Sequence, residues 1–446
     1  MLINSEQILQ SYQTSKVAGL DKPQIVHADI ESSLQQLAGN FNSSMQLDII
    51  GFSHNRKEIY KWTMGSGPLH ILCWSQMHGD EPTATAALLD VINYFSSGCD
   101  PESCRALAQK VTLHFVPMLN PDGADESTRE NAQGIDINRD ADALQSPEGQ
   151  LLNQLICQIK PQFAFNLHDQ SRYYAQGNTR HGVSLAWLAP SGDKGESITD
   201  SRRLAMQLIG SLIEDLNTLG NANFARYEDG FSVRAFGDFA AQQGSACILI
   251  ESGFVADDMN RQCARELNYV ALLQAFYRIA QGRFAVQAEA QYHALAKNKA
   301  EGMTDVLIRN LNIQTHSKQY QIDVSIKRDN LGVASVDEVG DLHHLGGYNT
   351  FDAKGMLFEA GLAYPVTHPL ELTNNRYDFL LRQGYCRFTG DLSLINNLTR
   401  RPIVRAIGES CPAQYRRKGL SPSWLIRDAD GIQAAVLEGQ LVILDN

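Results

Sequence analysis

The fold is decided by residues 69–82, which read Leu69-His70-Ile71-Leu72-Cys73-Trp74-Ser75-Gln76-Met77-His78-Gly79-Asp80-Glu81-Pro82. The apolar first half has the length and composition of a buried strand, and Gly79 and Pro82 mark the turn that ends it. In that turn His78 and Glu81 can converge on one cation if the backbone curls between them, which Gly79 permits. A catalytic zinc takes three such protein ligands and keeps a fourth position for water. Alone the motif is weak, because an ordinary surface turn also explains it.

The composition excludes several classes of protein. The chain has 446 residues, 43% of them hydrophobic, so it can bury a large core and form more than one domain. Its 38 Lys and Arg against 50 Asp and Glu give a net charge of −12, which argues against a partner as acidic as nucleic acid or an anionic membrane. No apolar stretch approaches the ~20 residues that a membrane span needs.

The N-terminus and the cysteines indicate a location. The first residues, Met1-Leu2-Ile3-Asn4-Ser5-Glu6-Gln7, have neither the basic nor the apolar region of a secretion signal. The eight cysteines form no Cys-x-x-Cys pair, and several lie in apolar runs where cysteine is usually a small buried side chain. We therefore expect no disulfide framework and a cytoplasmic protein.

Strands and helices alternate through the middle of the chain. The apolar patterns predict strands at 46–51, 58–62, 69–74, 111–118, 162–168 and 246–251, and helices at 84–95, 147–159, 198–217 and 257–281. This order indicates an α/β domain with a mixed, mostly parallel sheet flanked by helices. Function gathers at the carboxyl ends of the strands of such sheets. His78, Asn120, His168 and Glu251 all follow or end predicted strands there.

Taken together, these motifs resemble the zinc carboxypeptidases of the carboxypeptidase A superfamily, over residues 46–285. The matching pieces follow the family's order: Met77-His78-Gly79-Asp80-Glu81-Pro82-Thr83, Asn120-Pro121-Asp122-Gly123, Arg129, Gly134-Ile135-Asp136-Ile137-Asn138-Arg139, Leu167-His168 and Ile250-Glu251-Ser252-Gly253. The resemblance implies the fold of zinc carboxypeptidases and phosphorylase/hydrolase-like proteins. It also implies one zinc ion per chain.

The resemblance assigns a role to each of these residues. His78, Glu81 and His168 would bind the zinc, which makes hydroxide available at neutral pH by lowering the pKa of a water. Glu251 would take the proton of that water and pass it to the leaving amine. Arg129 would stabilise the developing oxyanion, and Asn138 and Arg139 would bind the terminal carboxylate of the substrate. Asp136 would orient a zinc-binding histidine from behind.

The specificity residues are less well defined. Tyr227 is the nearest candidate for the family's mobile tyrosine that caps the substrate, although an ordinary loop tyrosine fits equally well, and Tyr173 and Tyr174 are alternatives for the pocket wall. Phe236 falls near the position that floors the side-chain pocket, which would favour a small or apolar residue. Arg234 and Asp238 stand beside it, and an arginine there would favour an acidic residue. The sequence does not decide between the two preferences.

Two further segments flank the catalytic domain. Residues 1–45 are polar, with helical patterning, and are expected to be an N-terminal helical extension. Residues 303–446 carry short, regularly spaced strand patterns, for example at 306–308, 320–326, 332–336, 423–427 and 432–442. We expect a C-terminal β-rich accessory domain there, with a role in shaping the active-site entrance or in forming an oligomer contact.

The sequence thus predicts a zinc-dependent metallocarboxypeptidase that hydrolyses the C-terminal peptide bond of a peptide. The leading alternative is a zinc deacylase of N-acyl amino acids, of the aspartoacylase and succinylglutamate desuccinylase type. A catalytically silent peptide-binding relative is the third reading, although neither a ligand nor the general base is missing. The expected partner is a peptide or a small acylated amino acid, with no nucleic acid and no membrane, and a homo-oligomer stays open.

Overall fold

The computed structural model describes residues 5–98, 101–220, 222–228, 230–256, 258–284, 288–315, 317–329, 331–406 and 418–444. The chain divides into two compact units. The first unit consists of Met1–Gly177 and Gly182–Lys299, and the second of Asn178–His181 and Ala300–Asn446. Each is described by itself below.

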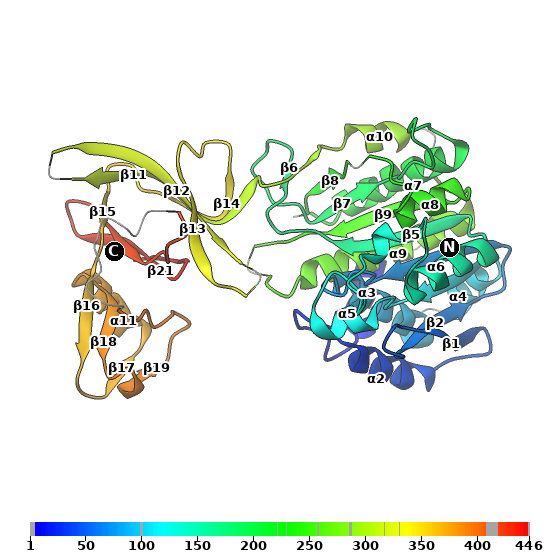
Figure 1. Ribbon diagram of the computed structural model, residues 1–446, viewed down its shortest axis with the longest axis horizontal. Coiled ribbons are helices and arrows are strands. Elements are labelled where there is room, and N and C mark those ends of the chain that lie inside the picture. The colour runs from blue at the N-terminus through cyan, green and yellow to red at the C-terminus, as the bar shows by residue number, and fades with distance from the viewer. Residues whose placement is uncertain are drawn as a thin grey trace. The chain divides into compact units, whose positions relative to one another are not determined.

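A mixed sheet forms the centre of the first unit (Figure 1). Its strands, in spatial order, are β1 (Met45–Phe52), β2 (Glu58–Met64), β4 (Val111–Val116), β3 (Leu69–Ser75), β5 (Phe163–Asp169), β9 (Ala246–Ser252), β7 (Leu185–Leu188) and β8 (Phe224–Arg226). Strands β4, β3, β5 and β9 run parallel in the middle, while β1 and β2 are antiparallel at one edge and β7 is antiparallel to β9. The predicted mixed, mostly parallel α/β sheet is therefore confirmed.

Helices cover both faces of this sheet. They are α1 (Ser5–Ser15), α2 (His27–Ala38), α3 (Thr83–Asn93), α4 (Pro101–Ala108), α5 (Pro121–Glu126), α6 (Pro147–Ile159), α7 (Asp200–Asn217), α8 (Phe236–Gln242), α9 (Gln262–Gln281) and α10 (Ala288–Ala294), with single turns at Tyr94–Gly98 and Ile137–Arg139. Two short strands, β6 (Ala175–Gln176) and β10 (Asn298–Lys299), pair outside the sheet.

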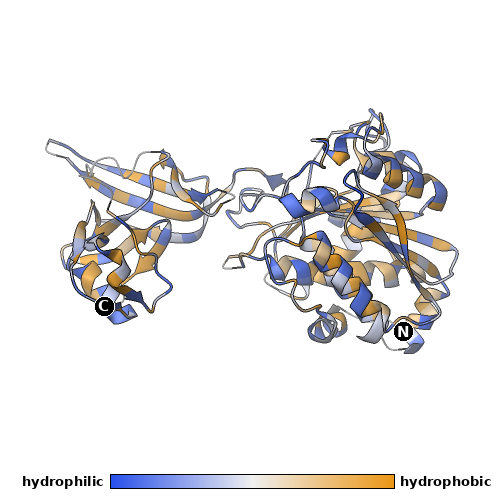
Figure 2. Cartoon of the chain, turned by 60° about the horizontal axis from the view of Figure 1, so that its bottom comes forward, coloured by the Kyte–Doolittle hydropathy of each residue, from blue (hydrophilic) through white to orange (hydrophobic). Residues whose placement is uncertain are grey.

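The central strands are buried on both faces, which explains their continuous apolar runs. On β3, Ile71 and Cys73 pack into the core beneath α1, α3, α7 and α9, whereas Leu72 and Trp74 pack into the core beneath α6 and α8. Figure 2 shows the hydrophobic residues concentrated along these strands and on the inner sides of the helices. The same alternation places Asn166 and His168 of β5 on one face, because side chains two residues apart point the same way.

A buried ion pair ties the N-terminal helices to the rest of this unit. Arg265 of α9 donates from Nε and Nη2 to the carboxylate of Asp90 on α3, at 2.7 and 2.6 Å. The backbone of Val17 completes the network, its N–H bonding Asp90 and its carbonyl accepting from Arg265. Asp90 and Arg265 are 0% and 1% exposed, so neither charge has water to replace its partner.

Removal of one partner should therefore be costly. Asp90→Ala would leave the Arg265 guanidinium buried without its counterion, and we expect the unfolding free energy of this unit to fall by about 3–5 kcal/mol. Lys22→Ala removes a partly exposed ion pair with Asp29, and should change it by only about 0–1 kcal/mol. Urea unfolding of the two variants beside the unchanged chain measures both values, and equal effects would contradict this account of the N-terminal segment.

The second unit is rich in strands. Its larger sheet has the order β13 (Ala334–Gly340), β12 (Gln319–Arg328), β11 (Met303–Gln314), β15 (Leu357–Glu359), β20 (Trp424–Arg427), β21 (Ile432–Leu437) and β22 (Gln440–Ile443), with β14 (Gly346–Asp352) paired to β11. A smaller part contains β16 (Leu362–Val366), β17 (Leu370–Leu372), α11 (Asn374–Arg382), β18 (Tyr385–Gly390) and β19 (Ile395–Asn397), with a single turn at Leu392–Leu394. The strand-rich character was expected, but helix α11 was not.

The cysteines give one observation that the sequence did not predict. Cys73, Cys157, Cys247, Cys263 and Cys386 are free thiols, but Cys104 is disulfide-bonded. Disulfides are uncommon in cytosolic proteins, and the cytoplasmic location stays a prediction. Within the described part of the chain, no helix combines the length and the apolar character needed to cross a membrane.

Candidate active site

The turn after β3 is locked against the loop that begins at Asn120. The Asn120 side chain donates to the carbonyls of Met77 and Glu130, at 3.2 Å each, and accepts from the backbone N–H of Gly123 at 2.9 Å. Gly79 permits this approach, because a Cβ at that position would lie 2.0 Å from the carbonyl carbon of Gly123. The two loops are therefore fixed together, and the turn carries its side chains into the carboxyl end of the sheet.

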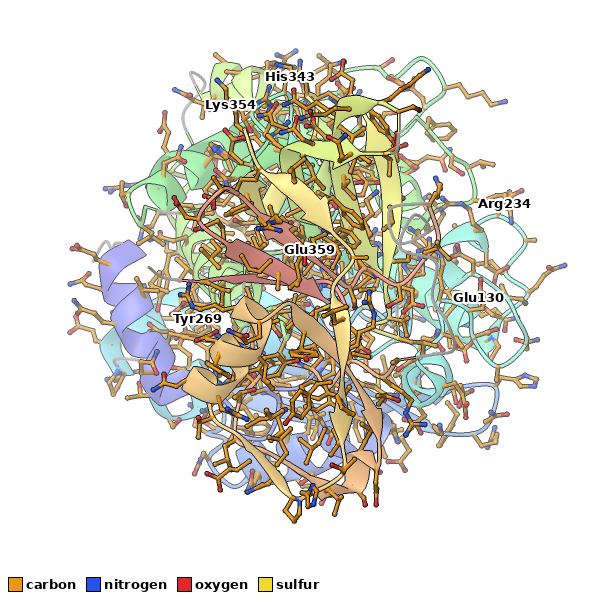
Figure 3. All side chains as sticks on the ribbon, turned by 90° about the vertical axis from the view of Figure 1, so that its left-hand side faces the viewer. Glu130, Arg234, Tyr269, His343, Lys354 and Glu359 are labelled. Atoms are coloured by element: carbon orange, nitrogen blue, oxygen red, sulfur yellow. The ribbon has the colours of Figure 1, made fainter. Side chains whose placement is uncertain are left out.

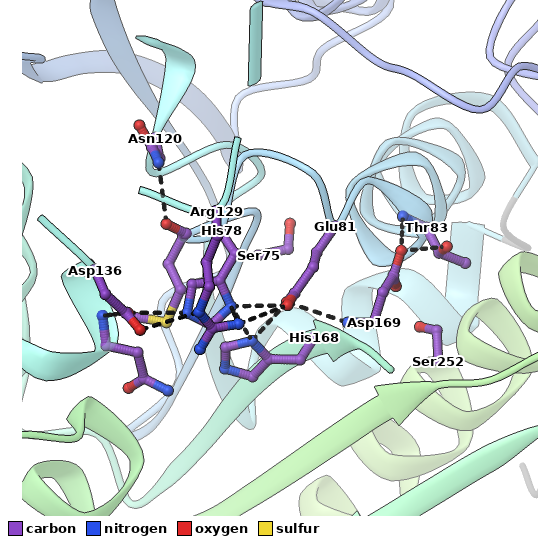
Figure 4. A network of polar contacts seen from close by, with 12 residues as sticks. Ser75, His78, Glu81, Thr83, Asn120, Arg129, Asp136, His168, Asp169 and Ser252 are labelled. Carbon is purple, nitrogen blue, oxygen red and sulfur yellow. Dashed lines mark hydrogen bonds and ion pairs between the residues drawn. The ribbon is translucent and has the colours of Figure 1, made fainter. Parts of the chain in front are cut away.

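Three buried side chains converge there, as Figure 4 shows. Glu81 lies between two histidines: its Oε1 is 2.8 Å from Nδ1 of His78, and its Oε2 is 2.8 Å from Nδ1 of His168. The two Nδ1 atoms are 3.2 Å apart. One ligand atom from each of the three residues can be chosen so that all lie within 4.8 Å of one another. Two imidazole nitrogens and a carboxylate are a donor set that zinc accepts, so the residues fit this metal.

Asp136 fixes the orientation of one of these rings. Its Oδ1 lies 3.1 Å from Nε2 of His78 and accepts the backbone N–H of Asn138, and its Oδ2 accepts from Nε of Arg129 at 3.0 Å. With Nε2 held in this way, Nδ1 of His78 is left facing Glu81 and His168. This is the contact predicted for Asp136, and carboxylates of this kind set the tautomer of a metal-binding histidine.

The charges of this cluster depend on one another. Burial disfavours a charge on His78, but Glu81 and Asp136 outweigh it and raise the pKa of His78 to about 9. Burial lowers the pKa of His168, which favours its neutral form. The pKa of Glu81 falls below its ordinary value, because its attraction to both histidines exceeds the effect of burial. Burial would also raise the pKa of Asp136, but its hydrogen bonds with His78 and Arg129 and its attraction to them outweigh burial and lower that pKa.

Glu251 stands beside this cluster. It pairs in register with His168 across β5 and β9, and its side chain points into the same pocket. Burial raises the pKa of Glu251 well above its ordinary value, and the nearby carboxylate of Glu81 adds to the effect. Among the residues that the structure describes, none forms a hydrogen bond with the Glu251 carboxylate. A buried carboxylate of this kind binds a proton readily, as a general base must.

The pocket has a volume of about 250 Å³, several times the ~30 Å³ of one water. Besides the residues above, its wall contains Arg129, Asn138, Arg139 and Tyr227. Oδ1 of Asn138 accepts the backbone N–H of Phe236 at 3.0 Å, so the amide nitrogen is turned away from that contact and can donate elsewhere. The structure thus gathers every predicted site residue at one pocket, with Asp136 directly behind it.

Two specificity residues were placed wrongly by the sequence. Phe236 does not line the pocket: it is fully buried in the core beneath α6 and α8, because α8 begins there and turns its ring into the sheet. Arg234 is exposed at the surface (Figure 3), and its Nε donates to the carbonyl of Arg139. Asp238, which the sequence also placed beside this position, does line the pocket, together with Gly237. Of the two tyrosines, Tyr174 lies on the pocket wall and Tyr173 does not.

The sequence reasoning also missed Asn166. Its side chain lines the pocket two residues before His168 on β5. The period of two along a strand was the available signal, since it places Asn166 on the same face as the predicted ligand.

Part of the chain is similar to known carboxypeptidases. A family profile described as zinc carboxypeptidase matches residues 30–232. Carboxypeptidase SOL1 of Arabidopsis thaliana is 29% identical over 131 residues, which cover 27% of this chain and 26% of that protein. Carboxypeptidase D of Anas platyrhynchos is 29% identical over 130 residues, which cover 25% of this chain and 9% of that protein. The chain thus aligns with a minor part of each relative.

Solved structures of similar fold include a metallo-carboxypeptidase from Burkholderia cenocepacia, with a TM-score of 0.47 and 16% identity over 59% of this chain and 70% of that one. Carboxypeptidase A from Helicoverpa armigera has a TM-score of 0.47 and 15% identity, over 62% of this chain and 80% of that one.

Residues 30–232 thus match the profile of the zinc carboxypeptidase family. The match includes the three candidate ligands and both arginines, but it ends before β9. The role predicted for Glu251 as general base is therefore supported by its position in the pocket and not by the family profile.

Zinc binding tests the three-residue site directly. The chain should bind one zinc ion, His168→Ala should lose stoichiometric zinc, and Asp136→Ala should weaken the affinity by about 10- to 100-fold because it frees the ring of His78. His54→Ala, at an exposed histidine, is the matched control and should bind as the unchanged chain does. Competition with a chromophoric chelator measures the affinities. Unaltered zinc binding by His168→Ala would place the metal elsewhere.

Proposed function

We propose that this chain is a zinc-dependent metallocarboxypeptidase, which removes the C-terminal residue of a peptide. The observation that carries the proposal is the convergence, in one pocket, of the candidate zinc ligands, the buried carboxylate of Glu251 and the polar pair Asn138 and Arg139. A hydrolase that acts at a chain end needs all three of these parts.

The residues divide the work of hydrolysis between them. When bound by His78, Glu81 and His168, zinc supplies Lewis-acid activation of a water and of the scissile carbonyl. Glu251 takes a proton from the attacking water and gives it to the nitrogen of the leaving amino acid as the peptide bond breaks. The raised pKa of Glu251 suits both steps, because its carboxylate accepts the proton and holds it until the amine departs.

Arg129 is placed to stabilise the charge that develops on the carbonyl oxygen. Its Nη1 lies 3.2 Å from Nδ1 of His78 and 3.4 Å from Oε1 of Glu81, so its guanidinium borders the metal site. Asp136 holds this arginine through its Nε. Donors fixed in advance in this way stabilise an oxyanion without having to reorganise during the reaction.

Asn138 and Arg139 support the choice of a chain end as the substrate. An arginine offers two parallel donors to a carboxylate, and the amide nitrogen of Asn138 adds another. Both line the same pocket as Glu251, so a bound C-terminal carboxylate would place the last peptide bond near the metal ligands.

The experiment is hydrolysis of N-blocked dipeptides and simple N-acyl amino acids by the zinc-loaded chain. We expect release of the C-terminal amino acid from dipeptides, and a loss of about 10²- to 10⁴-fold in kcat for Glu251→Gln. Glu214→Gln, at an exposed position on α7, is the control and should keep full activity. Cleavage of N-acyl amino acids alone would support the deacylase instead. Turnover that Glu251→Gln leaves unchanged would contradict the mechanism.

A second prediction concerns the free carboxylate of the substrate. Peptides with an amidated C-terminus should be cleaved far more slowly than their free acids, because the amide gives Arg139 no charge to bind. Arg139→Lys should raise KM for the free acid, since a lysine cannot offer two parallel donors. Initial rates on matched acid and amide peptides measure this difference. Equal rates would show that the site does not recognise a chain end.

A further inference from the structure

The turn that carries Glu81 is held from a second side, by the residue that follows His168. The backbone N–H of Asp169 donates to Oε2 of Glu81 at 3.2 Å, the same oxygen that faces Nδ1 of His168. The Asp169 side chain reaches the end of the turn, where its Oδ2 accepts from the backbone N–H of Thr83 at 3.1 Å and from the Thr83 hydroxyl at 2.7 Å (Figure 4). One residue thus makes three hydrogen bonds to this segment.

These hydrogen bonds supply the N-terminal cap that helix α3 does not provide for itself. The helix begins at Thr83, and the side chain of Pro82 before it makes no capping hydrogen bond. The first N–H groups of a helix have no partner within the helix and lie at the positive end of its dipole, so a carboxylate is favourable there. Asp169 provides this carboxylate from a position 86 residues away in the sequence. Because Thr83 is only 6% exposed, water has little access to replace it.

Asp169 is itself fixed by the sheet. It is the last residue of β5 and pairs in register with Ser252 of β9. The next residue, Gln170, donates its backbone N–H to the carbonyl of Ser252 at 3.0 Å, and Nη1 of Arg261 donates to the same carbonyl at 2.8 Å. The position of Asp169 is therefore set by β9, the strand that carries Glu251.

The three candidate ligands come from two separate segments of the chain. His78 and Glu81 lie on the turn after β3, and His168 lies near the end of β5. Asp169 joins these segments beside the ligands, because it follows His168 in the sequence and bonds both Glu81 and Thr83. Outer hydrogen-bonding partners of this kind orient the residues that bind a metal.

We propose that Asp169 is a positioning residue of the metal site, which sets the place of Glu81 relative to His168 through its contact with the start of α3. The inference rests on the zinc site of the proposed function, and not on the identity of the substrate. The carboxylate of Asp169 also lines the pocket, but its Oδ2 is committed to Thr83. Its role is to hold the turn.

The test is the zinc affinity of Asp169 variants, measured by competition with a chromophoric chelator. Asp169→Ala should weaken binding by about 10-fold or more, as the loss of an outer partner of a metal ligand does. Asp169→Asn keeps an acceptor oxygen and should stay within about 3-fold of the unchanged chain, since a neutral acceptor still bonds Thr83. Unaltered binding by Asp169→Ala would overturn the proposal.

The same comparison separates positioning from simple attraction between charges. Attraction of the metal needs the negative charge, which both variants remove, whereas positioning needs only the acceptor, which asparagine keeps. Equal losses of affinity in Asp169→Ala and Asp169→Asn would therefore overturn the proposal.

A variant of the partner residue gives a second test that leaves the charge of Asp169 in place. Thr83→Val removes the hydroxyl at nearly constant volume and should weaken zinc binding by about 3-fold, because the backbone N–H still bonds Asp169. Thr83→Ser keeps the hydroxyl and should restore the affinity of the unchanged chain. Zinc binding that Thr83→Val leaves unaltered would overturn the route through α3 on which the proposal depends.

Thr199→Ala is the matched control for loss of a helix cap. Thr199 caps α7, where its side chain accepts the backbone N–H of Arg202 at 3.2 Å. Its removal should lower the urea midpoint of the metal-free chain, as Asp169→Ala does, without changing the zinc affinity. An equal loss of zinc affinity in Thr199→Ala would show that affinity merely follows stability, and would overturn the proposal.

His168→Ala in the same titration distinguishes failure of this proposal from failure of the proposed function. If His168→Ala binds zinc as the unchanged chain does, the metal lies elsewhere and both proposals fail. If His168→Ala loses zinc while Asp169→Ala keeps it, only the role of Asp169 fails. Because the measurement is metal binding, a lack of turnover on any peptide does not alter its outcome.

Discussion

The arrangement of this site depends on the contact between two loops at the carboxyl end of the sheet. The side chain of Asn120 donates hydrogen bonds to the carbonyls of Met77 and Glu130. Gly79 has no side chain, so its backbone can pack directly against the backbone of Gly123. The first loop carries His78 and Glu81, and the second leads to Arg129 and Asp136. Any larger side chain at residue 79 would push the loops apart and separate the ligands from the residues that orient them.

The pairing register of the sheet positions the other residues of the site, which lie on β5 and β9. Parallel strands β5 and β9 end side by side, so His168 and Glu251 stand opposite each other. The same pairing places Asn166 against Leu249 one layer further in. One face of these two strands therefore carries His168 and Glu251 at its carboxyl end and Asn166 and Leu249 in the layer before it.

Much of this could be predicted from the sequence. Apolar runs that end in His168 and Glu251 indicate buried parallel strands, and the carboxyl ends of such strands meet at one edge. The spacing of His78 and Glu81 then suggests a metal. Phe236 could not be placed, because its burial depends on where α8 begins and on the hydrogen bond that its backbone gives to Asn138. Helix α11 was missed since it is short and lies between strands.

The unpaired carbonyl oxygen of the Asn166 amide also lay beyond prediction, because an asparagine in an apolar strand is usually satisfied by a neighbour. Within the described part of the chain this oxygen has no hydrogen-bond partner, and its isolation is visible only once the side chains around it are known. Tyr227 illustrates the opposite case: it lines the pocket as expected, while its movement over a substrate stays a prediction.

The most direct test of the central claim is X-ray absorption at the zinc edge of the metal-loaded chain. The account predicts a shell of nitrogen and oxygen ligands at ~2.0–2.2 Å, with the scattering of two imidazole rings and no sulfur. His168→Ala, loaded in the same way, should lose one imidazole contribution. A sulfur shell at ~2.3 Å, or a spectrum that this substitution leaves unchanged, would show that His78, Glu81 and His168 do not bind the metal.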